Sequence, residues 1–298
     1  MANLRDIRTR ISSVNNTQQI TKAMKMVAAA KLRKAQNKMS SNRPFAKKMK
    51  DVVVRLQSGS TTENELLRKP ESVDRVLFLV VGSDKGLCGG FNNNLFKVVE
   101  TTIFENYQQY VDDKALDVIT IGKKAGAYFK KRNYSVVGTH PGFFDDLSYS
   151  NTSEIMEFVI AEFTNGTYDR VVLAFNEFRT VIAQNRIVEQ LLPIEPETIA
   201  QNEGEISEVS TTDYIYEPDT ESILNELLPV YLVTQLWKAV LESNASEQGA
   251  RMAAMDNATE NAKELEQELR LKYNQARQSA ITTEISEIVS GAQALEDN

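Results

Sequence analysis

The stretch from Ile7 to Gln36 reads IRTRISSVNNTQQITKAMKMVAAAKLRKAQ and contains neither glycine nor proline. Its apolar residues recur three or four positions apart, which is typical of a helix that packs one seam against a partner. They are Leu4, Ile7, Ile11 and Val14 and, after a shift in phase, Ile20, Met24 and Val27. We expect one helix over residues 3–57, kinked at Pro44. At about 80 Å, such a helix needs support along its length.

A matching pattern occupies the C-terminal end of the chain. Small and apolar residues again step by four and three, at Ala258, Ala262, Leu265, Leu269, Tyr273, Ala276 and Ala280, followed by Ile281, Ile285 and Ile288. We expect a helix over residues 220–294 that is capped by Asp219 or Thr220 and bent near Pro229. Because it outruns the first helix by about 30 Å, its tip is expected to protrude alone from an antiparallel coiled coil.

Between the two ends, short apolar runs alternate with helical stretches. The predicted strands are Arg75 to Val81, Asp117 to Ile121, Tyr134 to Gly138 and Arg170 to Phe175, with one or two edge strands between Thr180 and Leu192 and a short one at Asp213 to Glu217. The predicted helices lie near residues 92–109, 122–132 and 152–165. This alternation predicts an α/β fold with a central, mostly parallel, Rossmann-like sheet. We expect three parts: an N-terminal coiled-coil helix at 1–57, the α/β domain at 74–217 and a C-terminal coiled-coil helix at 219–298.

Composition narrows the function classes. The net charge is -7, yet residues 1–50 carry 13 Lys and Arg against one acidic residue, so the first fifty residues are +12 and the rest is -19. A single cysteine and a single histidine argue against a disulfide framework and a clustered metal site. No apolar run reaches the roughly 18 residues of a membrane span, and no secretion signal is evident. We expect a soluble chain, or one held at a membrane by its partners.

The loop from Gly82 to Asn92, GSDKGLCGGFN, is the strongest candidate for chemistry because it connects a predicted strand to a predicted helix. Its glycines match the spacing of neither a Walker loop nor a dinucleotide loop, so a tight structural turn is favoured. Cys88 has no evident base, since the only histidine, His140, lies in a Gly and Pro turn. We expect no catalytic residue, although an α/β enzyme that uses Cys88 remains the alternative.

The basic first helix leaves a second alternative, a coiled coil that binds nucleic acid. Phe45 is the only aromatic residue among the first fifty, so base stacking has little support. A solvated outer face and a contact with an acidic protein surface stay open as equal interpretations of the basic residues. At the other end, Ala276 to Leu295 (ARQSAITTEISEIVSGAQAL) lacks aromatics and is rich in Ala, Ser, Thr and Ile. Its composition suggests a slim helix end that enters a socket. The acidic loop from Glu195 to Glu208 has no assigned role.

Three motifs together resemble one family. The run from Ile7 to Gln36, the loop SDKGLCGGFN from Ser83 to Asn92 and the end YNQARQSAITTEISEIVSGA from Tyr273 to Ala292 resemble the gamma subunits of bacterial F-type ATP synthases, and the resemblance extends over essentially the whole chain. It implies a non-catalytic rotor whose paired helices turn inside a ring of alpha and beta subunits, coupling ion flow to ATP synthesis or hydrolysis. It also implies contacts with the epsilon subunit and the c-subunit ring, with no nucleic acid or cofactor bound.

The resemblance also implies which residues meet the alpha and beta ring. On the first helix these are Met24, Lys25, Lys31 and Arg33; on the last helix they are the polar Arg277, Gln278 and Thr282 and the apolar Ile285, Ile288 and Val289. No cysteine-pair insertion of the chloroplast type is present, and no transit peptide precedes Met1. We therefore expect a bacterial chain that is peripheral on the cytoplasmic face of the inner membrane.

Overall fold

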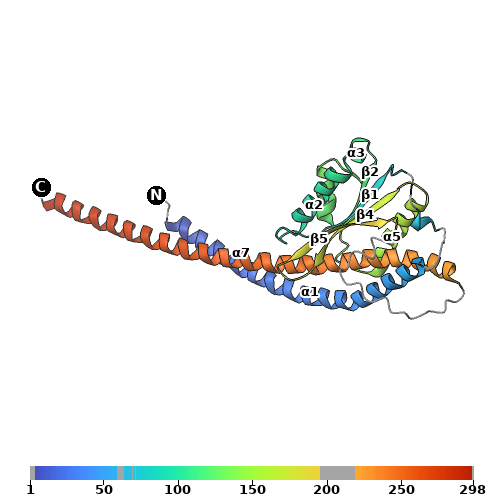
Figure 1. Ribbon diagram of the computed structural model, residues 1–298. Helices are drawn as coiled ribbons and strands as arrows, with labels where there is room; N and C mark the ends of the chain where they lie inside the picture. The colour runs from blue at the N-terminus through green and yellow to red at the C-terminus, as the bar shows by residue number, and fades with distance from the viewer. Residues whose placement is uncertain (1–3, 59–63, 69, 71, 195–218, 297–298) are drawn as a thin grey trace. The chain divides into compact units, whose positions relative to one another are not determined.

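The computed structural model describes residues 4–58, 64–68, 70, 72–194 and 219–296 (Figure 1). The acidic loop and the short strand predicted at Asp213 to Glu217 lie outside the described residues. The chain forms two compact units, one made of Met1–Ala29 with Arg251–Asn298 and the other of Ala30–Ala250. The division into parts at 1–57, 74–217 and 219–298 stays a prediction.

The second unit contains a five-stranded sheet in the order β3-β2-β1-β4-β5. Neighbouring strands are parallel except β4 and β5, which pair antiparallel. This confirms the predicted α/β fold with a mostly parallel sheet. The strands are β1 (Val76–Val81), β2 (Leu116–Ile121), β3 (Ser135–His140), β4 (Arg170–Phe178) and β5 (Gln184–Leu192), and the shorter helices are η1 (Glu65–Leu67), α2 (Phe91–Asn106), α3 (Gln108–Asp112), α4 (Lys123–Lys131) and α5 (Tyr149–Thr164).

Both faces of this sheet are covered by helices, which explains why β1 is apolar at every position. Leu77 and Leu79 pack into a cluster that includes residues from α5 and from the long helices, whereas Val76 and Phe78 pack against α2 and α4. Alternate side chains of a strand point to opposite faces, so a strand buried on both sides reads as a continuous apolar run. The run VLFLVV was therefore a reliable strand signal.

The long helices are α1 (Leu4–Ser58) and α7 (Thr220–Glu296). Both remain helical past an internal proline, Pro44 in α1 and Pro229 in α7. Asp219 caps α7 as expected: its carboxylate accepts from the Ser222 backbone N–H at 2.8 Å and from the Ser222 hydroxyl at 2.7 Å. The hydrogen bond from the Ser222 backbone is the main cause that lowers the pKa of Asp219.

In the first unit, α1 and α7 run antiparallel and pair side by side (Figure 1). Thr21 bonds to Thr259 through their hydroxyls at 2.7 Å, and Lys25 meets Asp256 at 2.6 Å. The lower-numbered residue of α1 therefore pairs with the higher-numbered residue of α7, which is the order expected of antiparallel helices. The buried residues of this seam are Ile7, Thr21, Ala28, Met255, Ala262 and Leu269.

The seam corrects one expectation from the sequence. The proposed phase shift to Ile20 and Val27 is wrong, because these side chains are 59% and 57% exposed. The seam instead keeps its spacing through the small residues Thr21 and Ala28. Two helices that pack closely favour small side chains at the seam, so the buried positions here are not the positions of the large apolar residues. Leu265 on α7, also assigned to the seam, is 45% exposed.

Candidate functional site

The loop after β1 is a turn filled by its own side chains. Asp84 accepts three backbone hydrogen bonds, from Lys123 at 2.9 Å, Gly142 at 2.7 Å and Phe144 at 3.1 Å. Lys123 begins α4, and free N–H groups at a helix start are where α/β folds commonly hold phosphate. Here a carboxylate of the chain takes that place, which supports the structural interpretation of this loop.

Cys88 is buried in the same turn. The Asn92 amide donates to its sulfur at 3.4 Å, and the sulfur lies 3.9 Å from the Lys85 carbonyl oxygen. A buried thiol in such surroundings is typically inert. His140 ends β3, and burial lowers its pKa, which favours the neutral ring. Within the described part of the chain, no group of three His, Cys, Asp or Glu side chains is arranged to hold a metal ion.

The basic residues assigned to α1 fall in both units. Met24 and Lys25 lie in the first unit and are half-buried, and Lys25 is engaged with Asp256. Lys31 and Arg33 lie in the second unit and are exposed. The two exposed cations therefore fit a charged contact surface better than Lys25, part of whose charge is neutralised within the chain.

The C-terminal end of α7 is exposed to solvent on all sides. All side chains described from Arg277 to Gln293 are exposed, and the red end of α7 continues past the start of α1 in Figure 1. The Thr282 hydroxyl donates to the backbone carbonyl oxygen of Gln278, one helical turn earlier, at 2.9 Å. Ile285, Ile288 and Val289 are 56%, 66% and 56% exposed. A monomer rarely presents branched apolar residues in such a group on one helix end without a partner.

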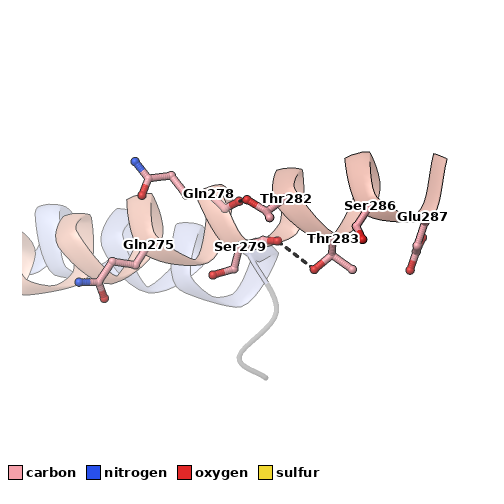
Figure 2. A pocket seen from close by; sticks show the side chains of 7 residues that line it. All are labelled: Gln275, Gln278, Ser279, Thr282, Thr283, Ser286 and Glu287. Atoms are coloured by element: carbon pink, nitrogen blue, oxygen red, sulfur yellow. Dashed lines mark hydrogen bonds between the residues drawn. The ribbon is translucent and has the colours of Figure 1, made fainter. Parts of the chain in front are cut away.

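The same helix end has a polar face. Figure 2 shows a shallow, open concavity along α7, whose seven lining residues are Gln275, Gln278, Ser279, Thr282, Thr283, Ser286 and Glu287. Their spacing of three and four places them on one side of the helix, whereas Ile281, Ile285 and Ile288 follow another side. The tip is thus amphipathic. Of the residues predicted there, Gln278 and Thr282 belong to the polar face.

Sequence reasoning missed a further apolar surface on α1. Ile20, Met26 and Val27 are 59%, 61% and 57% exposed, although the sequence pattern assigned Ile20 and Val27 to the seam. The available signal was their phase, since they fall outside the spacing set by Ile7, Ile11 and Val14. Three large exposed apolar residues within two turns of a helix mark a candidate partner surface.

Comparison with known proteins gives these surfaces a context. The family model for ATP synthase matches residues 3–295. The ATP synthase gamma chain of Chlorobaculum parvum is 49% identical over 296 residues, covering 99% of both chains, and that of Chlorobaculum tepidum is 48% identical over 296 residues with the same coverage.

Solved structures agree with this assignment. The central stalk and c-ring structure of the Tetrahymena thermophila mitochondrial ATP synthase contains a chain with a TM-score of 0.57 and 26% identity, covering 80% of this chain and 99% of that one. A chain in the rotor of the Euglena gracilis mitochondrial ATP synthase, at 19% identity and a TM-score of 0.67, has the same fold over 93% of this chain and 98% of its own. The chain belongs to the family of ATP synthase gamma chains.

Proposed function

We propose that this chain is the central rotor shaft of its ATP synthase, turning inside a ring of alpha and beta subunits that carries the catalytic sites. As a gamma chain it is a non-catalytic subunit. The observation that supports rotation most is the bare, amphipathic end of α7, where apolar Ile285 and Ile288 are exposed beyond the paired seam. A helix end of this kind fits a bearing that encloses it loosely and lets it turn.

The partners follow from the same proposal. The related solved structures are described as a rotor, as a central stalk with a c-ring and as an assembly of F1 and c-ring. We therefore expect the second unit to contact the epsilon subunit and the c-subunit ring on the cytoplasmic face of a bacterial membrane. No helix among the described residues has the length and hydropathy to span a membrane. Attachment through these partners is consistent with that finding.

The contacts with the alpha and beta ring fall into two kinds. Met24, Lys25, Lys31 and Arg33 on α1 are the mostly basic contacts, to which we add the exposed Ile20 and Val27. Arg277, Gln278 and Thr282 with Ile285, Ile288 and Val289 form the tip of α7. Each contact is expected to be weak, because a shaft that binds one orientation tightly cannot pass to the next.

Reversing the charges of Lys31 and Arg33 tests the basic contacts. An exposed ion pair contributes up to about 1 kcal/mol, so a K31E/R33E chain should bind the alpha and beta ring about tenfold more weakly at low salt. The difference should shrink as salt is added, because exposed charges are screened. Titration of the ring with labelled chain measures both effects.

The Lys272→Gln variant serves as the control, because this exposed lysine is already paired with Glu268 within α7. A K31E/R33E chain that binds like the unaltered chain at low salt would remove the basic contacts from the proposal. In the same titration, an I20S/V27S chain should bind more weakly at every salt concentration. Unchanged binding of that chain would exclude the apolar extension.

ATP hydrolysis by the purified chain separates this proposal from the enzyme alternative. The chain alone should be inert, while addition of the chain to an alpha and beta ring should restore steady hydrolysis. Hydrolysis that depends on Cys88 in the chain alone would contradict the proposal. Tight duplex DNA binding that persists at moderate salt would instead favour the nucleic-acid alternative.

A further inference from the structure

The end of β4 carries backbone groups that its neighbour β1 does not pair. The register between these parallel strands ends at Val80 and Ala174, whereas β4 continues to Phe178. Asn176 and Phe178 are two positions apart, so their N–H and C=O groups point to the same edge of the strand. Both residues are buried, and buried backbone groups need partners.

Helix α7 supplies most of these partners with side chains. The Ser243 hydroxyl accepts from the Asn176 N–H at 3.1 Å, and the Ser246 hydroxyl donates to the Asn176 carbonyl at 3.2 Å. Glu242 accepts from the Phe178 N–H at 3.0 Å. All three α7 side chains belong to residues that are at most 1% exposed. A helix face thus replaces the missing strand.

Helix α1 completes the arrangement through Arg43. Its guanidinium donates to both carboxylate oxygens of Glu242, at 2.8 and 3.0 Å, and to the Phe178 carbonyl oxygen at 3.2 Å. The Glu242 side chain is 2% exposed, and the Arg43 side chain is 48% exposed. We call this set, Arg43, Asn176, Phe178, Glu242, Ser243 and Ser246, the polar clamp.

The polar clamp differs in kind from the other contacts between the sheet and the long helices. The first turns of α7 pack on the sheet through apolar side chains such as Leu228, Leu232 and Leu236. Apolar packing is non-directional, so it resists separation of two elements more than sliding or turning between them. Bidentate arginine–carboxylate pairs and backbone hydrogen bonds have fixed geometry. The clamp therefore holds both helices at one height and one angle against the sheet.

We propose that the polar clamp transmits torque between the α/β sheet and the paired helices, with Glu242 as its positioning residue. This inference rests on the proposed rotor function. Torque that enters through the α/β sheet reaches α1 and α7 only if these helices cannot rotate relative to the sheet. Glu242 is the one described residue that bonds both to α1 and to the β4 backbone in this set.

The test uses the whole enzyme reassembled in lipid vesicles with a Glu242→Gln chain. ATP hydrolysis and the membrane potential it generates, reported by a voltage-sensitive dye, are followed together. Hydrolysis should persist, while the potential generated per ATP hydrolysed should fall at least about twofold. The control is Glu268→Gln, which removes an exposed carboxylate of α7 paired only with Lys272 in the described contacts, and it should leave the ratio unchanged.

An R43M/E242M chain removes the ion pair altogether. Its melting temperature should fall, because the buried Phe178 N–H loses the acceptor that Glu242 supplies, so its coupling is measured well below that melting temperature, where the chain stays folded. Its potential per ATP should fall further than that of E242Q, because the Phe178 backbone loses its partners. An unaltered ratio in either variant would overturn the clamp. Failure of the unaltered chain to support any potential would instead overturn the rotor function.

Discussion

A chain that ends at Thr282 should assemble with its partners but support ATP synthesis about tenfold more slowly than the full chain. The truncation removes Ile285, Ile288 and Val289, each at least 56% exposed, so no packing within the chain is lost. Full burial of one such side chain would contribute about 1.5–3 kcal/mol, and a loose bearing gives only part of that for each; a total of about 1.4 kcal/mol is enough for a tenfold change in rate. The rate of ATP synthesis in energised vesicles measures the effect.

The truncated chain should also melt like the full chain, since the described side chains after Arg277 are exposed. An I285S/I288S chain of full length is the matched variant, because it keeps the helix and removes much of the apolar face. It should reproduce most of the loss. A truncated chain that couples normally, or one that melts earlier in isolation, would contradict the bearing at the tip.

Replacement of Gly122 by alanine should lower the free energy of unfolding of the second unit by at least about 2 kcal/mol. Gly122 lies between β2 and α4 with a φ of +97°, a conformation that residues with a Cβ rarely adopt. An added Cβ would lie 2.9 Å from the Ser83 carbonyl carbon and 3.0 Å from its oxygen. These are backbone atoms, so the clash cannot be relieved by a side-chain rotation. Denaturant unfolding measures the loss.

Gly142 provides a control for the backbone angle alone. It has a φ of +77°, and an added Cβ would meet no atom within 4 Å. Gly142→Ala should therefore cost about 1 kcal/mol from conformational strain without the clash. If both variants lose the same free energy of unfolding, the close approach of Gly122 to Ser83 does not contribute to stability.

Much of the fold could be predicted from sequence because its signals are local. The apolar run of β1 and the capping residue Asp219 each report a structure that forms within a few residues. The seam was harder, because Thr21 and Ala28 are buried by their position opposite α7 and not by their hydrophobicity. An apolar pattern predicts a buried face only if its apolar residues are buried within the chain. Ile20 and Val27 are apolar but exposed, so they misplaced the seam.

The polar contacts were beyond prediction from one sequence. Arg43 and Glu242 are 199 positions apart, and neither lies in a motif. The interaction of Asp84 with Lys123 likewise depends on where α4 begins relative to β1. The tip of α7 was foreseeable from helix lengths alone, whereas its role in rotation came from the family resemblance.

Direct observation of rotation tests the rotor function most directly. With the alpha and beta ring fixed to a surface, a probe can be attached through I182C, at a position that is 88% exposed, while native Cys88 is 2% exposed and protected. Addition of ATP should make the probe turn continuously in one direction. A probe that stays at a fixed angle while the same ring hydrolyses ATP would show that the chain only braces the ring.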